Sequence, residues 1–135
     1  MYTTAVDAKS INTRYPWFLQ EKIDAEADVT IQIVGGRQFA FSRSRKGMHG
    51  LDWRKEIFTE NHERAEWLPF RLNEQQQLSV TRFVTECHAN WGRIDFLLQG
   101  EKLVFLEFNA NGQWAFLDHE NRYGLLDAVV AYLVG

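Results

Sequence analysis

The most regular pattern in the sequence lies in residues 93–109, RIDFLLQGEKLVFLEFN. Apolar side chains recur at every second position on both sides of a short polar segment, as expected for strands that bury one face. This pattern predicts strands over 93–98 and 103–109, joined by a turn at 99–102 into an antiparallel hairpin.

Burial of one face constrains the register of this hairpin, because directly opposed residues of an antiparallel pair point to the same side of the sheet. A three-residue turn at 100–102 makes one face wholly apolar through three opposed pairs: Leu98 with Val104, Phe96 with Leu106, and Ile94 with Phe108. The same register sets Asp95 opposite Glu107, with Asn109 two residues further along that face. A two-residue turn would instead oppose Asp95 to Leu106.

The polar face of the hairpin is a candidate metal site. Two carboxylates at cross-strand distance repel each other unless a positive charge lies between them, and a divalent cation is the simplest such charge. Asp95, Glu107 and Asn109 offer oxygen donors only, a set that suits Mg²⁺ or Mn²⁺. The alternative is that Asp95 and Glu107 are solvated residues on the outer face of the sheet.

The first half of the chain predicts further strands. Two alternating stretches flank Gly35 and Gly36, a pair suited to a two-residue turn with positive φ, so a second hairpin is predicted over 28–44. Residues 17–23 are predicted to form a short apolar strand. Residues 43–50 are basic and contain glycine, and we expect them to form an exposed loop.

Two helices complete the expected fold. Apolar residues at helical spacing predict a helix over 73–90, where Asn73 and Gln76 have the spacing of a capping box. A second, apolar helix is predicted over 124–134. Hairpins separated by helices indicate an α+β fold, with a mostly antiparallel sheet covered by helices on one face, in a single domain over 1–135.

Composition excludes several classes of function. The 15 Lys and Arg against 18 Asp and Glu leave a net charge of −3, which does not favour nucleic acid as a partner. Cys87 is the only cysteine, so no intramolecular disulfide forms, and we expect its side chain to be buried. No stretch approaches the ~18 apolar residues of a membrane span, and no signal peptide is apparent. We therefore expect no membrane partner and a cytoplasmic location.

Several motifs together resemble a known family. They are FLEFNANGQW (105–114), GRIDF (92–96), FLQEKI (18–23), DVTIQIVGG (28–36), DWR (52–54) and Leu68-Pro69. In this order they resemble the C-terminal portion of ATP-grasp ligases, in particular the peptide-modifying enzymes of the microviridin and graspetide type. The first motif is specific, DWR is moderately so, and the others are weak on their own.

The resemblance implies ATP-dependent ligation of a peptide. ATP phosphorylates a carboxylate, and an amine or hydroxyl then attacks the acyl phosphate to form an amide or an ester. Phosphoryl transfer depends mainly on positioning and on neutralisation of charge. By family position Asp95, Glu107 and Asn109 are the ligands of Mg²⁺ or Mn²⁺.

The resemblance also implies roles outside the hairpin. Arg54 of the DWR triplet would be catalytic, stabilising charge on the acyl phosphate or the tetrahedral intermediate; the alternative is a solvated loop arginine. The backbone of the adenine hinge would come from a predicted hinge strand at Glu21, Lys22 and Ile23. One departure concerns Thr30, because relatives usually have an arginine at this position. Arg43 and Arg45 are neighbouring basic residues that could supply the missing charge.

A further departure is the lobe that carries the glycine-rich loop and the phosphate-binding lysine, since almost no residues precede Trp17. We therefore expect the C-terminal portion of a ligase, incomplete on its own. The implied partners are ATP, a peptide or protein substrate, and either a separate N-terminal lobe or a further copy of the chain in a homo-oligomer. Two alternatives stay open: a non-catalytic interaction module derived from such a ligase, and a hydrolase using Asp95 and Glu107 as acid and base.

Overall fold

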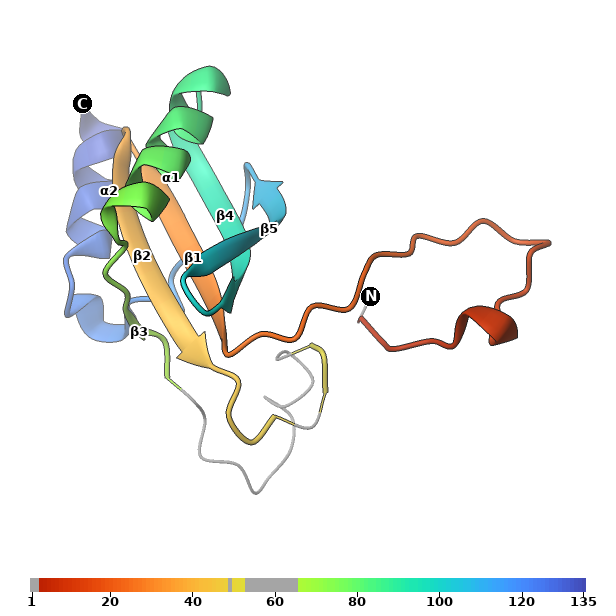
Figure 1. Ribbon diagram of the computed structural model, residues 1–135. Helices are drawn as coiled ribbons and strands as arrows, with labels where there is room; N and C mark the ends of the chain where they lie inside the picture. The colour runs from red at the N-terminus through yellow and green to blue at the C-terminus, as the bar shows by residue number, and fades with distance from the viewer. Residues whose placement is uncertain (1–2, 49, 53–65) are drawn as a thin grey trace.

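The described part of the chain forms a five-stranded antiparallel sheet with two α-helices (Figure 1). The computed structural model describes residues 3–48, 50–52 and 66–135. The strand order is β3-β2-β1-β4-β5. The elements, in chain order, are η1 (Ala8–Ser10), β1 (Ala27–Val34), β2 (Arg37–Ser44), β3 (Leu68–Pro69), α1 (Glu74–Glu86), β4 (Trp91–Gln99), β5 (Lys102–Asn109), η3 (His119–Asn121) and α2 (Leu125–Val134).

The predicted hairpin over 28–44 is confirmed as β1 and β2. Val34 pairs with Arg37 across a turn of Gly35 and Gly36, whose φ angles are 56° and 79°. Positive φ is the region that glycine adopts without steric cost, which is why this pair suits a two-residue turn.

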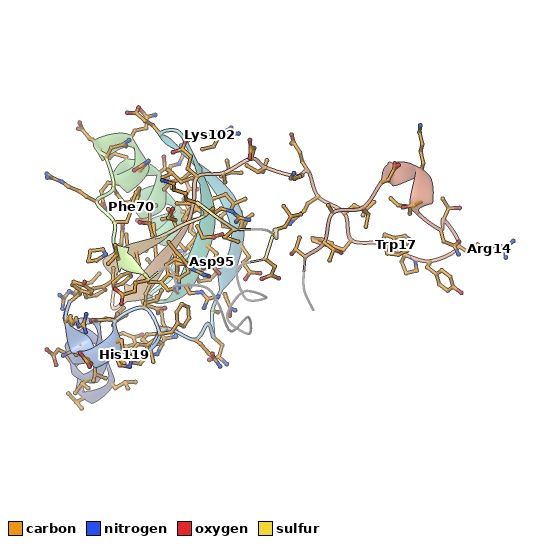
Figure 2. All side chains as sticks on the ribbon, turned by 90° about the horizontal axis from the view of Figure 1, so that it is seen from below. Arg14, Trp17, Phe70, Asp95, Lys102 and His119 are labelled. Carbon is orange, nitrogen blue, oxygen red and sulfur yellow. The ribbon has the colours of Figure 1, made fainter. Side chains whose placement is uncertain are left out.

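The sheet buries a separate apolar core on each face. On one face, Val80 of α1 packs against Val29 and Ile31 of β1 and their neighbours. On the other face, Leu125 and Val129 of α2 belong to a cluster that contains Val34, Phe41 and Leu117. The sheet therefore lies between the two helices, as Figure 2 shows.

The α+β class and the antiparallel sheet are confirmed, whereas the expected placement of the helices on one face is not what the structure shows. The physical reason lies in β1, because both faces of this central strand are buried. No helix in the described part of the chain is long and apolar enough to cross a membrane.

Helix α1 begins as predicted and ends earlier. Asn73 and Gln76 form the capping box, each side chain accepting a 2.9 Å hydrogen bond from the backbone N–H of the other. The helix ends at Glu86, with Cys87 as its C-cap. The prediction that Cys87 is buried is wrong, since its side chain is exposed where the helix ends.

Two predictions for the N-terminal half are also wrong. Residues 17–23 form no strand, and Figure 1 shows this segment leading away from the sheet. Phe18 is 93% exposed, so no strand partner covers its apolar side chain. The expected exposed loop over 43–50 is interrupted by Arg43, which lies in β2 and is buried.

Candidate functional site

The register of the β4–β5 hairpin brings the predicted carboxylates together. Asp95 pairs directly with Glu107, and Ile94 with Phe108, as predicted. Near the turn the prediction is wrong, because Gln99 pairs with Lys102 across a two-residue turn. A β-bulge at Leu106 then inserts one extra residue in β5, between the Phe96–Phe105 and Asp95–Glu107 pairs. Without the bulge, the two-residue turn would place Leu106 opposite Asp95. The extra residue returns Glu107 to this position.

Gly92 allows the end of this hairpin to close. A Cβ atom at Gly92 would lie 2.5 Å from the Phe108 ring and 3.2 Å from the Asn109 carbonyl oxygen. The residue also has a φ of 140°, which other residues rarely adopt. The glycine of the GRIDF motif therefore has a packing role beside the site.

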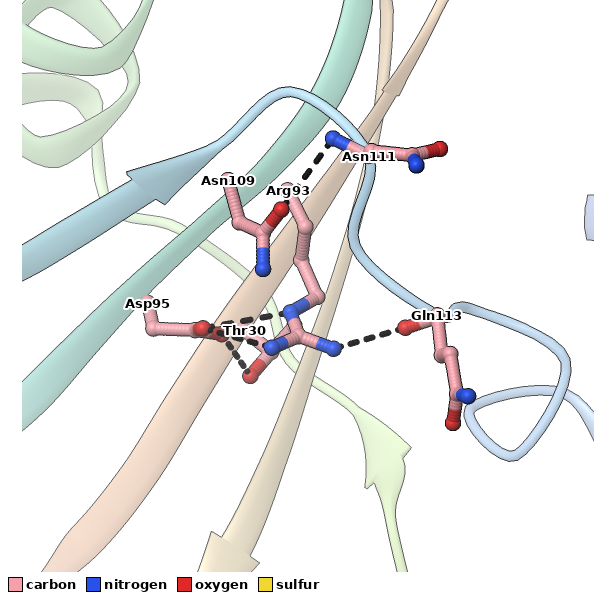
Figure 3. A network of polar contacts seen from close by, with 6 residues as sticks. All are labelled: Thr30, Arg93, Asp95, Asn109, Asn111 and Gln113. Carbon is pink, nitrogen blue, oxygen red and sulfur yellow. Dashed lines mark hydrogen bonds and ion pairs between the residues drawn. The ribbon is translucent and has the colours of Figure 1, made fainter. Parts of the chain in front are cut away.

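Both carboxylate oxygens of Asp95 accept hydrogen bonds (Figure 3). The Thr30 hydroxyl on β1 donates to Oδ1 over 2.8 Å. The Arg93 guanidinium donates to Oδ2 from Nε over 3.1 Å and from Nη2 over 2.9 Å. Asp95 is therefore held by two neighbours on the same sheet face, one neutral and one positively charged.

Arg93 links β4 to the segment that follows β5. Its Nη1 donates a 2.6 Å hydrogen bond to the Gln113 carbonyl oxygen, and its guanidinium carbon lies 5.7 Å from the centre of the Phe116 ring. A Cβ atom at Gly112 would lie 3.0 Å from Cβ of Arg93, so the glycine of FNANG makes room for this side chain. These contacts fix the guanidinium beside Asp95.

Asn109 and Glu107 complete the polar face at the end of β5. Asn109 pairs with Arg93 across the strands, and its Oδ1 accepts a 3.1 Å hydrogen bond from the Asn111 backbone N–H. The Glu107 side chain is exposed. The structure thus brings the three predicted ligands to one face, with Arg93 next to them.

A second arginine–carboxylate pair lies on the same face. Arg45 Nη1 contacts Asp28 Oδ1 over 2.7 Å, and both side chains are largely buried. Burial raises the pKa of Asp28 above 3.8, although the positive charges of Arg45 and Arg43 act in the opposite direction. The loss of hydration therefore outweighs the ion pair at this position.

The donor set fits a divalent cation with oxygen preference. No group of three or more His, Cys, Asp or Glu side chains that could hold a metal occurs within the residues described. Asp95, Glu107 and Asn109 supply two carboxylates and one amide, which suits an ion that keeps positions for water and phosphate oxygens. Buried Oε1 of Gln32 and Oδ2 of Asp28, on the same face of β1, have no hydrogen-bond partner in the part of the chain described.

The structure shows which positively charged side chain shares the Asp95 carboxylate with Thr30. Arg45 is paired with Asp28, and Arg93 is the guanidinium that contacts the hydrogen-bond acceptor of Thr30. Arg93 was not among the residues that sequence reasoning singled out. The signal was present, because Arg93 lies two residues before Asp95 and the strand period puts both on one face.

The remaining predicted site residues either lie away from this face of the sheet or are not among the residues that the structure describes. Arg54 lies outside the described residues; of the DWR triplet the structure describes Asp52, which is buried and accepts a 3.1 Å hydrogen bond from the Thr3 backbone N–H. The segment Glu21, Lys22 and Ile23 has no regular secondary structure and belongs to the stretch that leads away from the sheet (Figure 1).

Comparisons with known proteins identify the fold. No protein-family model matches the chain, and no curated protein matches it. Its structure is similar to a RiPP-associated ATP-grasp ligase from Chryseobacterium gregarium, solved with ADP and a leader and core peptide, with a TM-score of 0.69 and 24% identity over 84% of this chain and 34% of that one. The fold is that of part of an ATP-grasp ligase.

Two macrocyclases from Microcystis aeruginosa MRC support this assignment of the fold. MdnB matches with a TM-score of 0.63 and 21% identity, covering 85% of this chain and 32% of its own. MdnC, solved with the precursor peptide MdnA, matches with a TM-score of 0.64 and 21% identity, covering 83% of this chain and 34% of MdnC. The chain therefore spans about a third of the length of each of these three proteins.

Proposed function

We propose that this chain is the metal- and nucleotide-binding part of an ATP-dependent peptide ligase, which joins a carboxylate to an amine or hydroxyl through an acyl phosphate. The observation that carries the proposal is the direct pairing of Asp95 with Glu107 on a sheet of ATP-grasp ligase fold. Support for the nucleotide comes from the similar Chryseobacterium ligase, which was solved with ADP.

Asp95, Glu107 and Asn109 are the residues proposed to hold Mg²⁺ or Mn²⁺. When bound, such an ion neutralises charge on phosphate oxygens during phosphoryl transfer. Asp95 Oδ1 accepts a single hydrogen bond in the described structure, from Thr30, so it keeps a lone pair for an ion. Glu107 extends from the opposite strand, and the Asn109 oxygen is oriented by the turn at Asn111.

Other parts of the reaction are assigned by resemblance. Arg54 is proposed to stabilise charge on the reacting acyl group, and Glu21, Lys22 and Ile23 to supply backbone hydrogen bonds to adenine. The peptide substrate is supported by the peptides solved with the Chryseobacterium ligase and with MdnC. The chain spans about a third of these enzymes, and ligation is proposed to need further parts of such a ligase beside the part that this chain forms.

Calorimetric titration of the chain with Mg²⁺-ATP tests this proposal. The wild type is expected to bind weakly, and the double variant Asp95→Asn, Glu107→Gln is expected to lose at least about tenfold in affinity, because two charge-bearing ligands are removed. The control variant Glu101→Gln, Asp127→Asn makes the same change of charge at exposed positions. Equal binding by the wild type and the Asp95, Glu107 variant would refute the site.

A non-catalytic interaction module is a second candidate, and one observation favours it. Large apolar side chains are exposed in the N-terminal segment and on the outer surface of α2, including Trp17, Phe18, Leu126 and Leu133. An absence of nucleotide binding, together with a specific protein complex that survives the Asp95, Glu107 double substitution, would favour this function over ligation.

A further inference from the structure

Arg93 changes the charge of the candidate metal site. The site contains two carboxylates, Asp95 and Glu107, and one guanidinium in direct contact with Asp95. The side chains of Arg93 and Asp95 are 14% and 17% exposed, so water screens their interaction only in part. A free divalent ion at Asp95 would therefore meet one adjacent positive charge.

Arg93 is also held in place independently of Asp95. The Gln113 carbonyl, the Phe116 ring and the close approach of Gly112 contact its side chain from the segment after β5. Withdrawal of the guanidinium from an incoming ion would break these contacts. We therefore expect Arg93 to stay beside the site when an ion binds, and to repel it.

A phosphate group removes this repulsion. Arginine has five N–H donors, and in the described structure Arg93 uses three of them, two on Asp95 and one on Gln113. The remaining donors suit phosphate oxygens, which guanidinium groups bind through short charge-assisted hydrogen bonds. The same phosphate supplies negative charge to the metal ion.

We propose that Arg93 makes this site take a divalent ion together with a phosphate-bearing ligand in preference to the free ion. This inference rests on the proposed metal site and names the residue that couples the ion to the nucleotide. Arg93 is a specificity-determining residue in this role, and it acts through charge beside the ion.

Binding of Mn²⁺, followed by the electron paramagnetic resonance signal of the free ion, tests the coupling. The chain is titrated alone, with ADP and with pyrophosphate, as wild type, Arg93→Met and Arg93→Lys. We expect Arg93→Met to bind Mn²⁺ alone about tenfold more tightly than the wild type, because a neighbouring positive charge is removed. Addition of ADP or pyrophosphate should raise the Mn²⁺ affinity of the wild type more than that of Arg93→Met.

Two controls separate charge from structure. Arg93→Lys keeps the positive charge and should bind Mn²⁺ alone as the wild type does. Arg82→Met removes a positive charge from α1, where Arg82 is exposed and paired with Glu86, and should leave Mn²⁺ binding unchanged. A folded Arg93→Met variant is confirmed by circular dichroism before titration.

The inference is overturned if Arg93→Met binds Mn²⁺ alone no more tightly than the wild type, or if Arg93→Lys gains as much as Arg93→Met. Its failure differs from failure of the proposed site. When the wild type binds Mn²⁺ with ADP in a Glu107-dependent way but Arg93→Met gains nothing, the coupling alone is refuted. When Glu107→Gln binds as the wild type does, both are refuted.

Discussion

Thr30 and Asp95 lie opposite each other on β1 and β4, and the Thr30 hydroxyl donates a 2.8 Å hydrogen bond to Asp95 Oδ1. Arg93 contacts the other oxygen, so Asp95 is oriented from two strands at once. Thr30 is thus a member of the site, at a position where the resemblance to ATP-grasp ligases leads us to expect an arginine. A neutral residue at position 30 is accompanied here by a guanidinium at Arg93.

The substitution Thr30→Val tests the contribution of this hydrogen bond. Valine keeps the shape of threonine, so the free energy of unfolding should fall by about 1 kcal/mol through loss of the bond. Urea unfolding measures the change. Thr85→Val in α1, where the hydroxyl is exposed, is the matched control and should change stability by less than about 0.5 kcal/mol. Equal effects at both positions would show that the Thr30–Asp95 bond does not stabilise the fold.

Gly92→Ala tests the close approach of β4 to Phe108. The added methyl group would overlap the ring at 2.5 Å in an unfavourable φ region, and we expect a loss of about 3 kcal/mol in the free energy of unfolding. Gly100→Ala also has a positive φ but has no neighbour within 4 Å, so it should cost only about 1 kcal/mol. If thermal unfolding gives the same loss for both, packing against Phe108 does not limit position 92.

The raised pKa of Asp28 leads us to predict that the stability of the fold depends on pH. Burial raises its pKa in the folded state above the unfolded value of 3.8, so the folded chain binds this proton more tightly. Ionisation of Asp28 therefore costs stability, and the cost grows as pH rises from 3.8 through the folded pKa. The stability of Asp28→Asn relative to the wild type should rise over this window and then level off. Urea unfolding between about pH 4 and pH 8 measures it, and a difference that falls with rising pH would show that the ion pair with Arg45 dominates.

Asp118 holds the start of α2. Its buried carboxylate accepts hydrogen bonds from the backbone N–H groups of Tyr123 (3.0 Å) and Leu125 (2.9 Å), where Gly124 offers no side-chain cap. Asp118→Ala should cost about 2 kcal/mol in the free energy of unfolding. Asp127→Ala, exposed in the first turn of α2, should cost roughly 0.5 kcal/mol. Chemical denaturation that ranks the two variants in the reverse order would contradict this role of Asp118.

Alternation of apolar residues was enough to predict the part of the hairpin that forms the site. Ile94 and Phe108 must share a buried face. Their pairing sets Asp95 opposite Glu107, independently of the length of the turn. The turn itself was predicted one residue too long. The bulge at Leu106 could not be predicted from the pattern of apolar residues, since Leu106 is itself apolar.

Other features depend on tertiary contacts that a local pattern does not contain. The segment over 17–23 is apolar enough for a strand, but no neighbouring strand pairs with it in the described chain. The two-sided burial of β1, which separates the helices, follows from its central position in the sheet. Arg93 could have been found, because its spacing from Asp95 places the two side chains on one face.

Paramagnetic broadening by Mn²⁺ in nuclear magnetic resonance spectra tests whether Asp95, Glu107 and Asn109 hold a metal ion. Substoichiometric Mn²⁺ with ADP is added to the labelled chain, and the amide signals are followed. We predict that the signals of Asp95, Glu107 and Asn109 broaden first, and that the signal of Val80 on the opposite face broadens only at higher Mn²⁺ concentration. Retention of the three signals, or broadening centred elsewhere, would contradict a metal site at this end of the β4–β5 hairpin.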